Sequence, residues 1–287
     1  DTTSYAEESV ANKSKITKVV VPDTVTNIAQ GVFNGYSNLV EIDLPFVGSS
    51  ASLTSSADNE EILFGYIFGQ NSYTNSLFLQ QFYRNGSFYN YMCYIPASLI
   101  KVKVGNKGVL KRSFCSRRGG VFKNPNIETI ILAEGITNIY ANAFENCFKL
   151  KNIIIPDSVV SIGNEVFTGT SSNEGEYMTL ESVTLGPNLT TIGNDAFLYC
   201  PNLTSVYYNG TPSQFDDLLP HISSTGNANF TNAHRYYKWY DVDFKEVIEE
   251  RKRYFIETTN YKMIAGLIRL IENNVNWTEM SIFAKIK

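Results

Sequence analysis

Residues that commonly carry catalysis or bind metals are scarce in this sequence. The cysteines and histidines of the whole chain are Cys93, Cys115, Cys147, Cys200, His221 and His234. A nucleophilic Ser or Cys needs a neighbouring base, most often histidine, and a structural zinc site needs several Cys or His ligands at short spacings. No C-x-x-C pair occurs, and neither histidine lies in a recognisable motif. We therefore expect no catalytic residue, no metal site and no cofactor.

Aromatic residues offer binding chemistry instead. Eleven of them lie between residues 62 and 94, and Tyr83, Tyr89 and Tyr91 are the candidates for contact with a sugar or a peptide. Tyrosine suits such a surface because it has a broad apolar face, a hydroxyl group and few rotatable bonds. The alternative is that segment 46–98 is an inserted loop that packs a small core of its own onto the flank of the molecule.

A second candidate surface is basic. Eight basic residues and no acidic ones lie between 101 and 123: Lys101, Lys103, Lys107, Lys111, Arg112, Arg117, Arg118 and Lys123. Such a stretch can bind an anionic glycan, a wall polymer or a lipid surface, or it can be a solvated, degenerate structural unit. Nucleic acid is a poor candidate, because no aromatic residues alternate with the basic ones and the chain has a net charge of -4.

The elements that position these groups follow from a repeated phrase. Residues 155–167 read IPDSVVSIGNEVF and residues 185–197 read LGPNLTTIGNDAF. The unit L-x-x-I-x-I begins at Ile16, Leu39, Leu99, Ile127, Leu150, Leu180 and Leu203. A further apolar residue, an isoleucine and a phenylalanine follow at fixed spacings, which gives a period of about 23 residues, within the leucine-rich-repeat range. One unit cannot bury its apolar side, but stacked units can.

Each unit predicts one short strand, a turn at proline, and a return that carries a phenylalanine into the interior. The phenylalanines at this position are Phe33, Phe144, Phe167 and Phe197. Gly163 and Gly193 are expected where the chain turns tightly. The third unit, which begins at Leu99, is degenerate, because the spacing of its apolar residues up to Phe114 is irregular. Cys147 and Cys200 fall two strands apart, roughly 10 Å, so we expect buried thiols and no disulfide between them.

Alternate residues of each strand point away from the core. One predicted outward row reads Val20, Asp43, Lys103, Ile131, Ile154, Thr184 and Tyr207. A parallel row reads Lys18, Glu41, Lys101, Thr129, Asn152, Ser182 and Ser205. Ile131, Ile154 and Tyr207 are unexpected on a wet surface. They either reflect strand propensity alone or are covered by the C-terminal tail or by a ligand.

The phrases IPDSVVSIGNEVF, AEGITNIYANAFENCFKLKNIIIP and IGNDAFLYCPNLTSVYYNG resemble the BspA-like (Treponema pallidum type) leucine-rich repeats. The resemblance covers about residues 16–240. It implies a leucine-rich-repeat solenoid with short parallel strands and an irregular convex side. It also implies a secreted or surface-attached protein with a role in adhesion or other binding.

The domain organisation follows from where the repeat stops. We expect an N-terminal extension at 1–15, the solenoid at 16–240 with an aromatic-rich insertion at 46–98, and a two-helix tail at 241–287. The tail shows helical spacing of apolar residues and is either a cap on the solenoid or the start of a further domain. No run of about 18 apolar residues occurs, so no transmembrane segment is expected. The chain begins DTTSYAEESV, and we expect that a signal peptide has been removed.

Three functions are compatible with this pattern. The first is a non-enzymatic secreted or cell-surface protein that binds a protein or carbohydrate ligand. Its candidate contact residues are Tyr83, Tyr89, Tyr91, Lys101, Lys103, Arg112, Arg117, Arg118, Ile131, Ile154 and Tyr207. The second is a structural spacer that presents other domains. The third is a hydrolase with a site in the insertion, since folding can bring paired carboxylates together. The ligand and the oligomeric state do not follow from the sequence.

Overall fold

The computed structural model describes residues 4–5, 12–115, 126–169 and 178–237. The expected two-helix tail at 241–287, and the basic residues Arg117, Arg118 and Lys123, lie outside the described residues.

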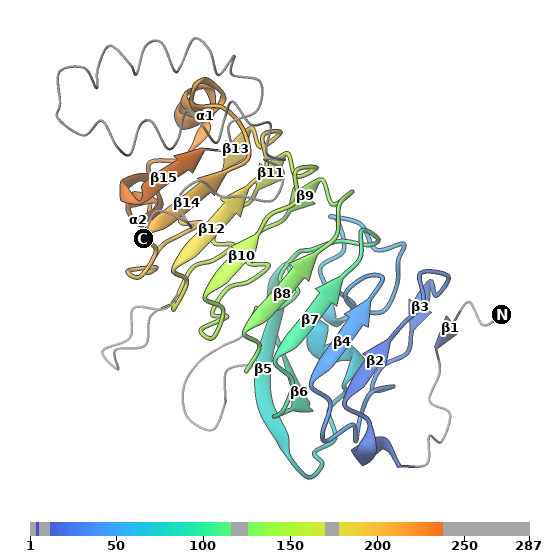
Figure 1. Ribbon diagram of the computed structural model, residues 1–287. Coiled ribbons are helices and arrows are strands. Elements are labelled where there is room, and N and C mark those ends of the chain that lie inside the picture. Colours follow the sequence, from blue (N-terminus) through green and yellow to red (C-terminus); the bar gives the residue numbers. More distant parts are fainter. Residues whose placement is uncertain (1–3, 6–11, 116–125, 170–177, 238–287) are drawn as a thin grey trace, which may run out of the picture. The chain divides into compact units, whose positions relative to one another are not determined.

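The described part of the chain is a solenoid built on one large parallel sheet. Its strands follow one another in chain order as neighbours (Figure 1). They are β2 (Lys18–Val20), β4 (Glu41–Leu44), β7 (Lys101–Val104), β8 (Thr129–Leu132), β10 (Asn152–Ile154), β12 (Ser182–Leu185), β14 (Ser205–Tyr208) and β15 (His234–Tyr237). The seven predicted repeat strands are confirmed, and β15 adds an eighth.

The register of this sheet follows from the alternation of apolar and polar residues. Val19, Ile42, Val102 and Ile130 pair in succession, and so do Ile153, Val183 and Val206. Their side chains point inward, and those of Ile42, Val102, Val183 and Val206 are fully buried. A shift of one residue would turn the apolar side chains to water, so burial fixes the register.

A second, narrower sheet lies on another side of each coil. It consists of β9 (Asn138–Ile139), β11 (Ser161–Ile162) and β13 (Thr191–Ile192). At the N-terminal end, β1 (Ser4–Tyr5) pairs in parallel with β3 (Asn27–Ile28). The glycines after β11 and β13 directly precede turns, as expected, but neither has a positive φ. A Cβ on Gly163 would lie 2.8 Å from the backbone nitrogen of Ala141, so glycine is required by the close approach of the neighbouring coil.

The left-handed backbone position of the repeat lies two residues before the phenylalanine. Positive φ angles occur there at Gly31, Arg112, Asn142, Glu165 and Asp195. The residue types vary because the turn is fixed by the stacked coils on either side, although a positive φ disfavours residues other than glycine, asparagine and aspartate.

A column of phenylalanine rings fills the interior, as predicted. Phe114, Phe144, Phe167, Phe197 and Phe230 stack with successive centroids 4.7–5.5 Å apart, and each is buried. The spacing matches that of the strands, so each coil contributes one ring per step. Phe230 lies in α2 (Ala228–Asn232), within the last coil before β15.

Segment 46–98 completes this column, and the expectation of a separate small core is wrong. The second coil has no phenylalanine of its own at the repeat position. The position is filled by two short helices of the insertion, η2 (Glu60–Ile62) and η3 (Phe64–Ile67). The ring centroid of Phe64 lies 5.2 Å from that of Phe68 and 4.8 Å from that of Phe114. Backbone hydrogen bonds run from Phe33 N–H to the Ile67 carbonyl and from Phe64 N–H to the Ser113 carbonyl. Residues 46–69 are therefore the irregular side of the second coil.

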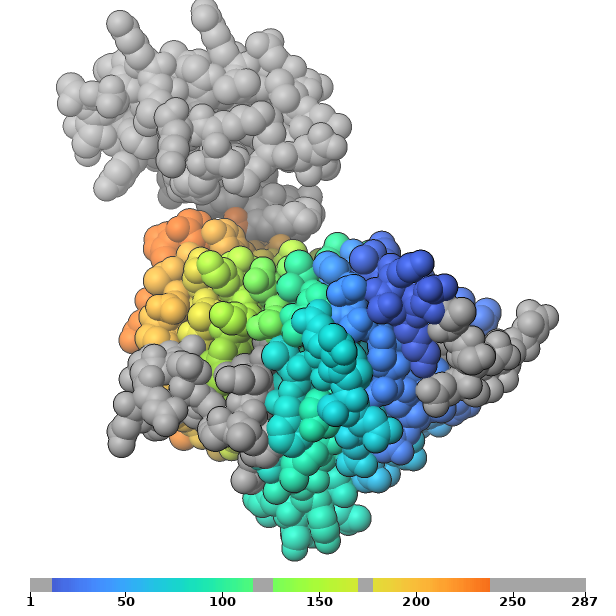
Figure 2. Space-filling view, turned by 90° about the horizontal axis from the view of Figure 1, so that it is seen from below, coloured from blue at the N-terminus to red at the C-terminus, as the bar shows by residue number. Residues whose placement is uncertain are grey.

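The rest of the insertion is an antiparallel hairpin of β5 (Ser76–Asn85) and β6 (Ser87–Pro96). Figure 2 shows this segment, in teal, projecting from the body of the repeat. Its base is held by Gln81, which is buried. Gln81 Oε1 accepts from Gly65 N–H at 2.6 Å, and Nε2 donates to the carbonyls of Ser113 and Cys115.

The C-terminal coil replaces the usual return with short helices. α1 (Pro212–Leu218) begins at Thr211, whose hydroxyl accepts from Gln214 N–H while the Gln214 side chain accepts from Thr211 N–H. η4 (Leu219–His221) follows directly, and η1 (Lys13–Lys15) lies at the other end of the solenoid. All four cysteines are buried and free, including Cys147 and Cys200.

Candidate functional site

The outward row of the large sheet lies in the predicted register. Val20, Asp43, Lys103 and Ile131 pair in succession, and Ile131 continues through Ile154, Thr184 and Tyr207 to Tyr236. We call the outward side of this sheet the open face. It consists of this row and of the parallel row that starts at Lys18 and ends at His234.

One half of the open face is apolar. Ile154 is 65% exposed, and Ile131 and Tyr207 are each more than 40% exposed. The rings of Tyr207 and Tyr236 stack at 4.8 Å with an interplanar angle of 16°. Between Ile154 and Tyr207 stands the smaller, half-buried Thr184. Three large apolar groups therefore meet solvent along one line.

The other half of the open face is charged. Glu41 lies 3.3 to 3.5 Å from the ammonium groups of Lys18, Lys101 and Lys103, and Asp43 lies 3.8 Å from Lys103. Burial raises the pKa of Glu41, but hydrogen bonds from Lys18 and Lys103 and the charges of Lys18 and Lys101 outweigh it, so the pKa lies below its ordinary value. Lys18 and Glu41, which are neighbours in the predicted parallel row, are thus part of a larger charged cluster.

A cavity of about 300 Å³ borders this charged cluster. It is lined by the ends of β4, β7 and β8, among them Asp43, Lys103, Asn106 and Ile131. Because Ile131 belongs both to the cavity and to the apolar row, the two halves of the open face are continuous there.

The hairpin places its three candidate tyrosines differently. Tyr89 is 46% exposed and stacks on the half-buried Tyr83 at 5.3 Å. Tyr91 is 4% exposed, and its hydroxyl accepts a hydrogen bond from Gln30 Nε2 at 3.0 Å. The expected exposure of Tyr91 is therefore wrong, because the inner side of β6 faces the solenoid. Phe88 and Met92, which the sequence did not single out, are exposed on the opposite side of the strand.

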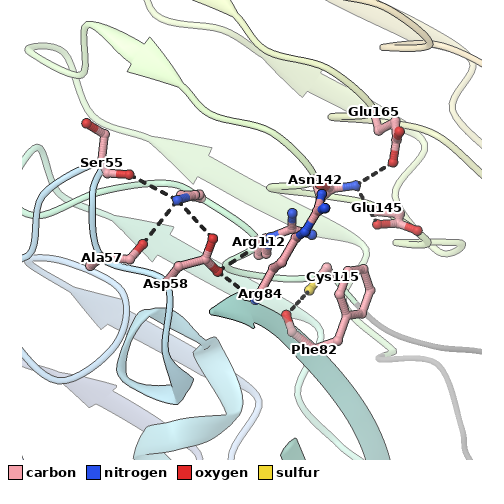
Figure 3. A network of polar contacts seen from close by, with 11 residues as sticks. Ser55, Ala57, Asp58, Phe82, Arg84, Arg112, Cys115, Asn142, Glu145 and Glu165 are labelled. Atoms are coloured by element: carbon pink, nitrogen blue, oxygen red, sulfur yellow. Dashed lines mark hydrogen bonds and ion pairs between the residues drawn. The ribbon is translucent and has the colours of Figure 1, made fainter. Parts of the chain in front are cut away.

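The basic residues near 112 are engaged within the protein. Asp58 lies 3.2 Å from Lys111 Nζ and 3.8 Å from Arg112 Nε, and it also accepts from Arg84 N–H (Figure 3). Arg112 is 9% exposed, and its guanidinium lies 5.4 Å from the centre of the Phe82 ring. Arg112 is therefore not an exposed contact residue, contrary to the expectation from charge alone, because folding brings Asp58 beside it.

Comparison with known proteins gives the family. The model of the BspA type leucine rich repeat region matches residues 3–93 and 118–219, in six copies. The chain belongs to this family. No curated protein matches it in sequence.

Three solved structures of bacterial proteins resemble this BspA-type chain. A leucine-rich repeat protein from Bacteroides ovatus is 18% identical, with 77% of this chain and 42% of that chain covered and a TM-score of 0.41. A Treponema pallidum leucine-rich repeat protein is 18% identical over 78% and 70% of the two chains, with a TM-score of 0.31. A leucine-rich cell surface protein from Faecalibacterium prausnitzii is 14% identical over 80% and 81%, with a TM-score of 0.21. The chain thus spans less than half the length of the Bacteroides protein.

The reactive residue types of this BspA-type chain lie apart from one another. Burial raises the pKa of Cys93, Cys115, Cys147 and Cys200, which keeps these thiols protonated. His221 borders a cavity of about 420 Å³ beside α1, whereas His234 packs edge-on against Tyr236 on the open face. Among the described residues no group of three or more Cys, His, Asp or Glu could hold a metal ion. In the same part of the chain, no helix has the length and apolar character that crossing a bilayer requires.

Outside the insertion, the carboxylates of Glu145 and Glu165 share one hydrogen-bond donor. Asn142 Nδ2 donates to Glu145 and to Glu165, each at 2.8 Å (Figure 3). Glu165 occupies the left-handed position of the next coil, so its bond with Asn142 joins adjacent coils, whereas the bond with Glu145 lies within one coil. Within the insertion, Asp58 is held by Lys111, Arg112 and the Arg84 N–H group.

Proposed function

We propose that this chain is a secreted or cell-surface binding protein without catalytic activity, and that it recognises a protein or carbohydrate ligand with its open face. The observation that carries the proposal is the line of Ile131, Ile154 and Tyr207, which expose apolar groups on three coils of one sheet, with Thr184 between the last two. Exposed apolar side chains that lie together on one surface can mark an interaction site. Membership of the BspA type family supports the surface location.

The test compares the same substitution at two exposed β-branched residues, one on the open face and one outside it. The purified chain is applied to a glycan array and to a panel of host extracellular-matrix proteins. We expect Ile154→Asp to abolish the binding found with the unaltered chain, because a carboxylate at the centre of the apolar line must be desolvated on contact. Val160→Asp is the matched control, since Val160 is also exposed but lies outside the open face. Equal binding by both variants would contradict the proposal.

Two further variants separate the candidate surfaces. Phe88→Ala and Tyr89→Ala remove the exposed aromatic rings of the hairpin, and unchanged binding in both excludes the hairpin as the contact. Loss of binding in about 0.5 M salt favours a contact through exposed charges, such as the lysines of the open face, because salt screens them. The absence of binding to both panels favours the spacer hypothesis.

The hydrolase hypothesis has less support. A hydrolytic site in the insertion needs converging carboxylates within a cleft. Asp58 is neutralised by Lys111 and Arg112, and the two cavities described above contain no residue of 46–98.

A further inference from the structure

The two halves of the open face differ in chemistry, and together they describe one class of ligand. This inference rests on the proposed function and concerns the nature of the partner. We infer that the open face binds an extended protein segment that carries a carboxylate side chain and, about four residues away, a bulky apolar side chain.

The charged half favours an anionic group. Three ammonium groups, those of Lys18, Lys101 and Lys103, share two carboxylates, so one positive charge is left over. The lysine side chains are between one-third and about one-half exposed. A partner carboxylate can therefore reach them without displacing protein groups. The adjoining cavity is lined by the carboxylates of Asp23 and Asp43 as well as by Lys103, and Asn106 Nδ2 donates to the Glu134 carbonyl. The anionic group of the partner is therefore expected on the exposed lysines and not inside the cavity.

In the apolar half, the smaller Thr184 stands between Ile154 and Tyr207, and we call the space above its side chain the notch. The Tyr207 ring is nearly parallel to that of Tyr236, and their 4.8 Å separation equals the usual spacing of strands. The ring normal therefore runs across the strands, and the second face of Tyr207 is turned toward Thr184. Ile154 stands on the other side of Thr184. The two walls are two strand steps apart, roughly 10 Å, which leaves room for one aliphatic or aromatic side chain in contact with both.

The distance between these two sites sets the spacing in the ligand. Lys103 lies on β7 and Thr184 on β12, which are three strand steps apart through β8 and β10. Three steps amount to about 14 Å, which an extended chain covers in about four residues.

The polar row favours an extended chain over a helix. Beside the apolar row lie Thr129, Asn152, Ser182 and Ser205, and Ser182 Oγ donates to Asn152 Oδ1 at 2.7 Å. These side chains can hydrogen-bond the free backbone amides of an extended segment, whereas a helix satisfies its amides internally. An acidic glycan is the competing ligand. A peptide is favoured because its free backbone amides match the hydrogen-bonding side chains of the polar row.

The probe is a random-peptide library displayed on phage and selected against the immobilised chain. We expect the selected peptides to share an Asp or Glu separated by three to five residues from Leu, Phe, Tyr or Trp. A synthetic peptide of the selected sequence is then measured by fluorescence anisotropy. Its affinity should fall about tenfold or more when the apolar residue is changed to Ala, which corresponds to roughly 1.4 kcal/mol.

Variants of the chain locate the contacts. Thr184→Phe fills the notch and should weaken the peptide about tenfold, whereas Thr191→Phe, on β13 outside the open face, should not. Lys103→Met should weaken the acidic peptide and leave its Asn or Gln version unchanged. Circular dichroism confirms that each variant is folded.

Four results would overturn the inference, and the first three concern peptides. They are a selection without the acidic and apolar pair, an empty selection, and undiminished peptide binding by Thr184→Phe. Capture of acidic glycans that depends on Lys103 but not on Thr184 would also overturn it, while leaving the proposed function intact. If Ile154→Asp also retains all binding on the glycan and matrix panels, the proposed function itself fails.

Discussion

At the scale of single residues, Gln81 shows how the hairpin is joined to the solenoid. Its side chain accepts a hydrogen bond from the Gly65 N–H and donates one to the Cys115 carbonyl, and both of these residues are buried. We expect Gln81→Leu to lower the free energy of unfolding by roughly 2 to 4 kcal/mol, because each buried group left without a partner costs about 1 to 3 kcal/mol. Urea denaturation measures the change.

The control for this prediction is the neighbouring Gln80→Leu. Gln80 is half-buried on the opposite side of β5. Its substitution should change the free energy of unfolding by less than about 1 kcal/mol. An equal loss in both variants would show that leucine itself, and not the lost hydrogen bonds, disturbs the hairpin.

The buried Tyr91 should make the free energy of unfolding fall with pH in the alkaline range. Burial raises its pKa to about 12, together with the nearby Cys93, Tyr66 and Glu60 and against the hydrogen bond from Gln30. Between pH 10 and 12 the unfolded chain loses the proton and the folded chain keeps it. The stabilisation is therefore complete below pH 10 and declines above it, by up to about 1.4 kcal/mol for each pH unit.

Tyr91→Phe tests this pH dependence. Urea denaturation at about pH 9, 10 and 11 should give a shallower decline in the free energy of unfolding for the variant than for the unaltered chain. Tyr89→Phe, at an exposed position, should leave the slope unchanged. Identical slopes for all three chains would show that Tyr91 ionises freely in the folded state.

At the scale of elements, segment 46–98 combines two parts with different roles. Residues 46–69 belong to the second coil, and the hairpin of β5 and β6 is an addition to it. Gly65 lies so close to Cys93 and Gln81 that a Cβ there would overlap the Cys93 sulfur. The hairpin is therefore seated directly on the coil backbone, which makes it a rigid support for its exposed tip.

Phe64→Ala measures the contribution of this segment to the core. The ring is buried between Phe68 and Phe114. We expect the substitution to lower the free energy of unfolding by about 3 to 5 kcal/mol, as for other buried phenylalanines. Phe88→Ala, at a position 57% exposed, should lower it by less than about 1 kcal/mol. Similar small losses in both would mean that the insertion is only loosely attached.

At the scale of the whole repeat, each coil contacts chiefly its neighbours. The stability of such a chain is roughly a sum of coil and interface contributions. Phe167 contacts Phe144 on one side and Phe197 on the other. We expect Phe167→Ala to speed amide hydrogen exchange in the coils from 150 to 210 more than in residues 39–114. Hydrogen–deuterium exchange with mass spectrometry measures this by segment.

This prediction has one control and one outcome that would contradict it. Val160→Ala, at an exposed position in the same coil, should leave the exchange pattern unchanged. Uniformly faster exchange from 12 to 237 in Phe167→Ala would show instead that the solenoid opens as one cooperative unit.

The sequence alone was sufficient for the repeat period, the register of the seven strands, the phenylalanine column and the outward row from Val20 to Tyr207. These features depend on periodicity along the chain, because identical units stack and burial fixes which side faces inward. The same alternation within 76–96 would have indicated that Tyr91 points inward with Leu79 and Cys93, while Phe88 and Met92 point outward.

Only the tertiary structure decided the remaining features. Asp58 pairs with Lys111 and Arg112 from more than fifty residues away, and Phe64 fills the column in a coil that lacks its own phenylalanine. The notch at Thr184 likewise depends on Tyr236, whose ring sets the orientation of Tyr207. In each case the charge or shape of a residue is determined by a partner distant in the chain, and local periodicity contains no information about that partner.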